Sequence, residues 1–274
     1  MALLIVPAGL LTFMLLVGPM LWMGRISLNE YSVEQFMIEA LTLQNYVKAI
    51  VDPYYLNVLA VTFGVALLCT ALTLLLALPV AYALARTERS WKSLMVIVTL
   101  FPLLVGNVVR SAGWMAILGK GGLINYTLRL LDLPEVKMMY TTSAVVIGIV
   151  AVVLPYMILT LCSVIESVPR NLEEAAENLG ARRLRTFVSV LWPLMRPGVA
   201  AGSVLVFVLC MNTYATAVLL GGPQFKMMAP AVYDQFVIAN NWPFGAALAF
   251  ILLAMTLLFT VAGSMLLARR YHRK

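Results

Sequence analysis

Long runs of apolar residues recur along this chain, and each is about as long as a lipid bilayer is thick. A helix needs roughly 20 residues to cross the hydrocarbon layer. The runs are continuous and do not alternate with polar residues, so they predict helices rather than the strands of a membrane barrel. The expected spans cover residues 2–24, 56–85, 93–109, 141–165, 199–220 and 243–268.

The composition agrees with a chain that is solvated partly by lipid. Hydrophobic residues make up 62% of the sequence and charged residues 11%, and the mean hydropathy is +0.95. We therefore predict an all-α polytopic membrane protein with about six transmembrane helices, in which residues 1–274 form a single transmembrane domain. The first run is too long for a typical signal peptide and no basic residues precede it, so we expect it to remain as a span.

The residue types that usually carry catalysis or bind metals are sparse. Cys69, Cys162 and Cys210 each lie inside an apolar run, and no CxxC spacing occurs. The single histidine, His272, stands in a basic tail, where we expect it among lipid headgroups. The sequence also has no Walker A pattern for nucleotide phosphates. These patterns predict neither a catalytic site nor a metal site, and they predict that this chain binds no cofactor itself.

The charged residues are distributed unevenly between the segments that join the spans. Segments 86–92, 166–198 and 269–274 together carry 12 Lys and Arg against 5 Asp and Glu, whereas the rest of the chain carries 7 of each. Basic residues are enriched on the cytoplasmic side of membrane proteins. We therefore expect a multi-pass protein of a bacterial inner membrane with both termini in the cytoplasm, and we expect residues 25–55 to form the first periplasmic loop.

The expected cytoplasmic loop 166–198 is the longest strongly charged segment. Leu172, Ala175, Ala176 and Leu179 recur at helical spacing, which predicts a short helix with one narrow apolar face that stops at Gly180. Leu184, Phe187, Val188 and Leu191 repeat the spacing, and we expect Pro193 with Pro197 to end this second helix before the fifth span. The loop is thus predicted to hold two short amphipathic helices.

Three functions fit such a pair of helices. The small side chains would let another protein approach closely, while Glu174 and the arginines Arg182, Arg183 and Arg185 would orient the contact. Alternatively, the helices lie in the headgroup layer with their arginines on phosphates. A DNA-binding helix-turn-helix has similar spacing, but its position between two membrane spans argues strongly against it.

The loop resembles the EAA signature of permease subunits in ATP-binding-cassette importers. The matching residues, in order and spacing, are Glu174, Ala175, Ala176, Leu179, Gly180, Ala181, Phe187, Pro193 and Pro197. The resemblance implies that this loop is a coupling helix, seated in a cleft of a separate ATPase subunit that uses ATP and Mg. It also implies as partners two ATPase subunits, a second permease subunit, identical or homologous, and an external solute-binding protein. Membrane lipid is a further expected partner, and nucleic acid is not.

Other segments resemble the spermidine/putrescine branch of this family. They are Leu43-Gln-Asn-Tyr46, Arg110 to Trp114 continuing to Asn125, Leu220 to Pro223, and Asn241 to Gly245. The resemblance implies a polyamine as the transported solute. Import of another small organic solute by the same class of importer stays open, and a secondary transporter working without ATP is a weaker alternative, because the spans hold no pair of acidic residues for ion coupling.

Polar residues inside the spans are candidates for the solute path, because they are costly in lipid and usually face a protein interior or a wet cavity. The candidates are Asn107 in the third span, Tyr156 in the fourth, and Asn212 and Tyr214 in the fifth. Amide oxygens and aromatic faces suit an organic cation. The same residue types also join helices through hydrogen bonds, and this alternative applies to each of them.

Overall fold

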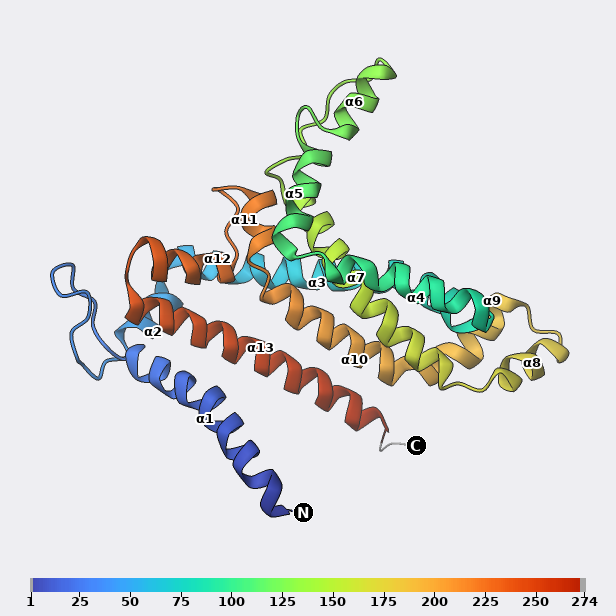
Figure 1. The fold of residues 1–274 in the computed structure, drawn as a ribbon, viewed down its shortest axis with the longest axis horizontal. Coiled ribbons are helices and arrows are strands. Elements are labelled where there is room, and N and C mark those ends of the chain that lie inside the picture. The colour runs from blue at the N-terminus through green and yellow to red at the C-terminus, as the bar shows by residue number, and fades with distance from the viewer. Residues whose placement is uncertain (1, 272–274) are drawn as a thin grey trace. The chain divides into compact units, whose positions relative to one another are not determined.

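A computed structural model describes residues 2–271 of the chain (Figure 1). Residues 272–274 lie outside the described part, so the predicted place of His272 among lipid headgroups stays a prediction. Helices make up most of the described part. They are α1 (Ala2–Ile26), α2 (Gln44–Val51), α3 (Pro53–Arg86), α4 (Arg89–Leu104), α5 (Asn107–Leu118), α6 (Leu123–Leu130), α7 (Thr142–Glu166), α8 (Arg170–Asn178), α9 (Arg183–Thr186), the π-helical turn η1 (Phe187–Leu191), α10 (Trp192–Met211), α11 (Ala215–Gly221), α12 (Met228–Tyr233), the π-helical turn η2 (Asp234–Ile238) and α13 (Trp242–Tyr271).

The predicted number of membrane spans agrees with the described helices. Five of them are long and apolar enough to cross a membrane, namely α1, α3, α7, the continuous helix Arg183–Met211 and α13. A sixth span results if α4 and the bent segment after it are counted as one broken span. The all-α fold class is therefore confirmed.

The third span is broken where the sequence predicted one continuous helix over 93–109. Segments Trp91–Leu104 and Asn107–Leu130 meet at an angle of 94°. Pro102 and Gly106 weaken the helix at this point. The guanidinium of Arg110 then folds back and donates hydrogen bonds to the carbonyl oxygens of Pro102 and Val105, the latter at 2.8 Å. Arg110 thereby satisfies carbonyls that the interrupted helix leaves open.

The fifth span differs from its prediction at both ends. It begins at Arg183 and runs through Pro193 and Pro197, so the expectation that these prolines end a separate amphipathic helix is wrong. Pro193 lies in the first turn of α10, where a proline is tolerated, and follows a π turn in which Trp192 N–H bonds to the Phe187 carbonyl. The C-terminal part of the span breaks between α10 and α11, where the Asn212 and Thr213 side chains bond to backbone carbonyls of α10.

Internal contacts divide the chain into two compact units, which are described separately. One contains Met1–Val61 and Met227–Thr256, and the other contains Thr62–Lys226 and Leu257–Lys274. In the second unit, α7 is the most buried span and runs beside α10 (Figure 1). A Cβ at Gly198 of α10 would overlap the Val164 side chain of α7, so glycine permits this close approach.

In the first unit, the loop after α1 is held by hydrogen bonds to a buried polar turn. Glu30 and Ile38 form an isolated antiparallel bridge, and the side-chain amide of Asn45 in α2 donates to the carbonyls of Ser27 and Asn29 at 2.9 and 2.8 Å. The segment 25–55 thus contains a short helix, α2, held against the turn that follows α1. Tyr55 packs edge-on against Phe244 and accepts a hydrogen bond from Gln235.

Candidate functional site

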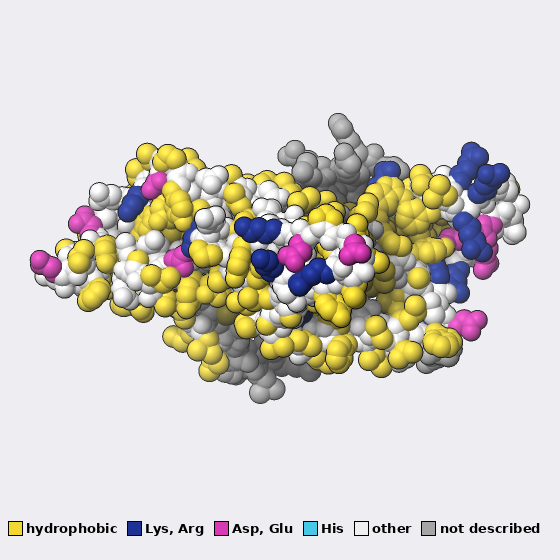
Figure 2. Space-filling view, turned by 90° about the horizontal axis from the view of Figure 1, so that it is seen from above, with side chains coloured by type: hydrophobic (Ala, Val, Ile, Leu, Met, Phe, Trp, Pro, Cys, Tyr) yellow, Lys and Arg dark blue, Asp and Glu magenta, His cyan; other side chains and the backbone are white. Residues whose placement is uncertain are grey.

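The predicted docking helix corresponds to α8, which follows Pro169 directly. Its apolar residues are uncovered: Leu172 is 42% exposed, and Leu179, just after the helix, is 90% exposed. Leu184 and Val188 in the adjoining α9 and η1 are also exposed. Figure 2 shows basic and acidic side chains gathered over α8 and α9, while most of the visible surface is hydrophobic. The segment combines uncovered apolar side chains with charge, which suits contact with another protein.

Gly180 ends α8 in the way that its position in the sequence predicted. It adopts a left-handed backbone conformation with φ +86°, which L side chains rarely adopt. Its N–H donates to the Glu177 carbonyl at 2.9 Å, and the Ala181 N–H donates to the Ala176 carbonyl at 3.0 Å. These two bonds define a Schellman motif, which satisfies the last carbonyls of the helix.

Glu173 fixes the inner side of α8. Its carboxylate forms an ion pair with the guanidinium of Arg86 and accepts a hydrogen bond of 3.0 Å from the Tyr82 hydroxyl. Arg86 also donates to the Val168 carbonyl, while Arg170 donates to the Arg86 carbonyl at 2.9 Å. Glu174, the next residue along, is exposed. Adjacent helix positions point about 100° apart, so one glutamate is bound inward while the other stays available outside.

A second ion pair joins the two loops that were both expected in the cytoplasm. The Lys92 ammonium lies 2.8 Å from the Glu166 carboxylate at the end of α7. Neither this ion pair nor the pairing of Arg86 with Glu173 is predicted from the sequence. Opposite charges in two short segments on the same side of the membrane were the signal that could have indicated them.

The remaining residues of the EAA pattern lie in α8 and in the segment that leads from it into α10. Phe187 contacts the rings of Tyr82 and Trp192. Pro193 is exposed and Pro197 is half-buried, both inside α10. Ala175 is exposed, whereas Ala176 and Ala181 are half-buried. The structure thus places the pattern on one continuous surface element from α8 to the first turns of α10.

Most of the candidate path residues lie where spans are broken. Asn107 is the first residue of α5, Asn212 ends α10, and Tyr214 precedes α11; all three are exposed. Tyr156 is 38% exposed in the middle of α7. Thr216, in contrast, is buried, and its hydroxyl lies 3.1 Å from the Ser111 hydroxyl, so it joins α11 to α5. The breaks therefore present polar groups outside the helix bundle, while Thr216 serves packing.

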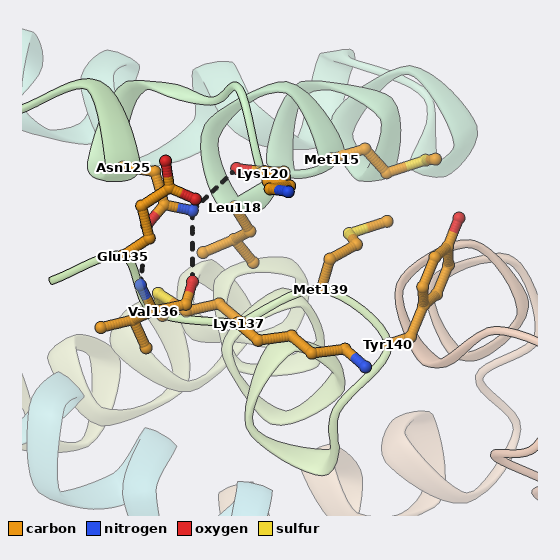
Figure 3. Close-up of a pocket in the computed structure, with 11 residues that line it drawn as sticks. Met115, Leu118, Lys120, Asn125, Glu135, Val136, Lys137, Met139 and Tyr140 are labelled. Carbon is orange, nitrogen blue, oxygen red and sulfur yellow. Dashed lines mark hydrogen bonds between the residues drawn. The ribbon is translucent and has the colours of Figure 1, made fainter. Parts of the chain in front are cut away.

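A cavity of about 610 Å³ lies between the end of α5 and the segment that leads into α7 (Figure 3). Met115, Met139 and Tyr140 line its apolar part. The buried Asn125 holds its wall, because the side-chain amide donates to the Gly119 and Val136 carbonyls and its oxygen accepts from the Val136 N–H at 3.0 Å. The cavity is at the opposite end of α7 from α8.

The charges of this cavity do not suit a polycation. Lys120 and Lys137 line it together with one carboxylate, Glu135, which forms an ion pair of 3.2 Å with Arg129. The net charge of these lining side chains is positive, so they would repel a cationic solute. None of the candidate path residues lines the cavity. A path for an organic cation is therefore better sought at the broken spans.

The long apolar helices and the exposed, ion-paired α8 define a multi-pass α-helical membrane protein with a surface element between its fourth and fifth spans. Residues 136–271 match the family model described as binding-protein-dependent transport system inner membrane component. The spermidine/putrescine transport system permease protein PotB of Escherichia coli (strain K12) is 34% identical over 215 residues, covering 77% of this chain and 78% of the relative. The chain belongs to this family of importer permeases.

Further comparisons agree with the assignment. PotB of Haemophilus influenzae is 30% identical over 258 residues, which cover 92% of this chain and 90% of that protein. A chain of the bacterial alginate ABC transporter, solved with its periplasmic protein, superposes with a TM-score of 0.80 at 13% identity, covering 96% of this chain and 91% of that one. The chain is thus a permease subunit of an ABC importer in the inner membrane, and the ATPase activity belongs to a separate subunit.

Proposed function

We propose that this chain, paired with a second permease subunit, forms the path of an ATP-driven importer for a polyamine such as spermidine or putrescine. We propose also that α8 docks on the ATPase and couples its cycle to the path. The observation that carries the coupling is the uncovered apolar side of α8, with Leu179 90% exposed, on a helix whose end and inner side are fixed. A rigid helix with an open apolar side is ready to enter a groove of another protein.

Charge favours a protein partner over the headgroup layer for α8. The helix Arg170–Asn178 contains one arginine and three glutamates, and Arg170 is already bound to a backbone carbonyl. Helices that lie on a membrane surface are instead rich in Lys and Arg on their polar side. Anionic lipid would repel the exposed glutamates of α8. Arg182, Arg183 and Arg185 follow after Gly180, which gives a docking surface of mixed sign.

The polyamine proposal rests on relatives and on path chemistry. PotB of Escherichia coli and PotB of Haemophilus influenzae, 34% and 30% identical to this chain, are both described as spermidine/putrescine permeases. Asn107, Tyr156, Asn212 and Tyr214 offer amide oxygens and aromatic faces to an organic cation. An importer for another small organic solute is the alternative, because a chain with the same fold belongs to a transporter described as importing alginate.

In the proposed cycle, an external solute-binding protein delivers the solute to the outward side of the path. Two ATPase subunits bind ATP and Mg, close on each other, and draw together the α8 segments of the two permeases. The path then changes from inward-facing to outward-facing. The orientation with both termini in the cytoplasm, as the charge distribution predicts, puts α8 on the ATPase side.

The test is ATP hydrolysis by the reconstituted complex of both permeases, the ATPase and the binding protein. We expect spermidine to stimulate hydrolysis with the unaltered chain and not with Glu174→Ala combined with Gly180→Asp. The matched control changes the same residue types at exposed positions outside the spans and outside α8, as Glu34→Ala with Gly121→Asp. Stimulation by a different solute would reject the polyamine and keep the importer, whereas a complex that never retains the ATPase would reject the coupling role.

A further inference from the structure

The connection between α8 and α3 depends on polar contacts. No residue of α8 is buried, so little apolar surface ties this helix to the spans. The helix borders α9 and η1, which continue into α10. Its direct links to α3 are the ion pair of Glu173 with Arg86 and the hydrogen bonds from Tyr82 to Glu173 and from Arg170 to the Arg86 carbonyl. Direct transmission from α8 to α3 therefore depends on these few polar groups.

Arg86 and Glu173 are well suited to hold two helices in a fixed relation. Their side chains are only 15% and 13% exposed, so water screens the pair weakly. Both carboxylate oxygens of Glu173 are occupied, one by the Arg86 guanidinium and the other by the Tyr82 hydroxyl. A carboxylate held at two points by two residues of one helix fixes direction as well as distance.

Tyr82 extends the contact to the base of the fifth span. Its ring meets the Phe187 ring edge-on, with centroids 6.2 Å apart, and Phe187 contacts Trp192 at the start of α10. A single glutamate of α8 thus contacts α3 directly and is linked to α10 through two aromatic rings, those of Tyr82 and Phe187. The spans α3 and α10 are both long enough to cross the membrane.

We propose that Glu173, Arg86 and Tyr82 form the junction that passes movement of α8 to α3 and α10. The inference rests on the proposed docking of α8, and it names the residues that carry the movement onward. Glu174 and Leu179 contact the ATPase, whereas Glu173 acts as a positioning residue that contacts only this chain. Removal of its charge therefore leaves ATPase binding in place and uncouples hydrolysis from transport.

The experiment compares Glu173→Gln with Glu88→Gln, which makes the same chemical change at an exposed position outside α8, two residues after Arg86. Spermidine uptake per ATP hydrolysed is measured in proteoliposomes with the ATPase and binding protein, together with retention of the ATPase. We expect Glu173→Gln to retain the ATPase and its basal hydrolysis but to lose at least about fivefold in uptake per ATP, the low end of typical coupling between sites. Glu88→Gln should behave like the unaltered chain.

A charge exchange separates a mechanical role from a merely structural one. The double variant Arg86→Glu with Glu173→Arg restores an ion pair, and we expect it to recover much of the uptake per ATP. Normal coupling by Glu173→Gln, an equal loss in Glu88→Gln, or a loss of ATPase retention that the exchange does not repair would each overturn the junction. Failure of the unaltered chain to retain the ATPase would reject the proposed docking and this inference with it.

Discussion

The backbone N–H of Gly180 donates a hydrogen bond of 2.9 Å to the carbonyl of Glu177, and this bond turns the chain out of α8. The turn requires the left-handed conformation that Gly180 adopts. The left-handed backbone conformation therefore explains why glycine occupies this position of the EAA pattern. The next bond, from the Ala181 N–H to the Ala176 carbonyl, depends on the same turn.

Replacement of Gly180 by alanine should destabilise the end of α8 by about 1–2 kcal/mol, because a Cβ disfavours left-handed backbone. Gly180→Asn should be milder, since asparagine tolerates this conformation better. We expect solute-stimulated ATP hydrolysis to be highest with glycine at position 180, lower with asparagine and lowest with alanine. Gly64→Ala is the control, because a Cβ at this position of α3 meets no atom within 4 Å. Equal activity of the three residues at position 180 would show that the left-handed turn is not needed for coupling.

The sequence was sufficient for the spans and for the stop at Gly180, since both follow from local rules of length and backbone conformation. The breaks were harder to predict. Pro102 and Gly106 were visible, but the bend also depends on Arg110 returning to carbonyls on the preceding helix. Pro193 was misread because a proline in the first turn of a helix is tolerated, and the sequence did not reveal that the helix begins at Arg183.

In the candidate site, too, local features could be predicted from the sequence and long-range contacts could not. Leu172 and Leu179 were predicted to share an apolar face, and the structure leaves both exposed. The pairing of Glu173 with Arg86 joins residues 87 positions apart, and no local pattern selects which glutamate turns inward. Long-range side-chain pairing requires the tertiary arrangement of α3 and α8. The path residues stay predictions, because their role depends on a partner subunit.

Selective labelling of single cysteines can test the predicted orientation. The native Cys69, Cys162 and Cys210 are buried, so a membrane-impermeant maleimide should react mainly with a cysteine introduced at an exposed site. Positions 137 and 179 are both exposed and lie beyond opposite ends of α7, so Lys137→Cys and Leu179→Cys should be on opposite sides of the membrane. In intact cells we expect labelling of Lys137→Cys alone. Labelling of Leu179→Cys should appear only after the membrane is opened.

The ATPase should protect one of these positions. In opened membranes, added ATPase should slow the labelling of Leu179→Cys and leave that of Lys137→Cys unchanged. The reverse pattern of labelling in intact cells would contradict the predicted orientation. Unslowed labelling of Leu179→Cys in a complex that retains the ATPase would contradict docking at the end of α8.

The hydrogen bond between Ser111 and Thr216 should stabilise the contact of α5 with α11 only modestly. Both residues are buried, and the hydroxyls lie 3.1 Å apart. A double-mutant cycle with Ser111→Ala and Thr216→Val, measured by unfolding in detergent, should give a coupling energy of about 0.6 kcal/mol, as is typical inside membranes. A coupling energy of zero would mean that the two hydroxyls contribute independently.

Gly198 and Val164 offer a sharper test of packing between α10 and α7. A Cβ at Gly198 overlaps the Val164 side chain, so Gly198→Ala should destabilise the permease by about 1–3 kcal/mol, the usual cost of overpacking. Val164→Ala removes the two methyl groups that would lie 2.2 and 2.6 Å from the new Cβ and leaves the Val164 Cβ at 2.9 Å, so we expect it to restore part of the stability when combined with Gly198→Ala. The measurement is the thermal midpoint of the permease in detergent. If Val164→Ala gives no rescue, the contact between Gly198 and Val164 is not the cause of the lost stability. The close approach of α10 to α7 at Gly198 would then not be what stabilises this part of the fifth span.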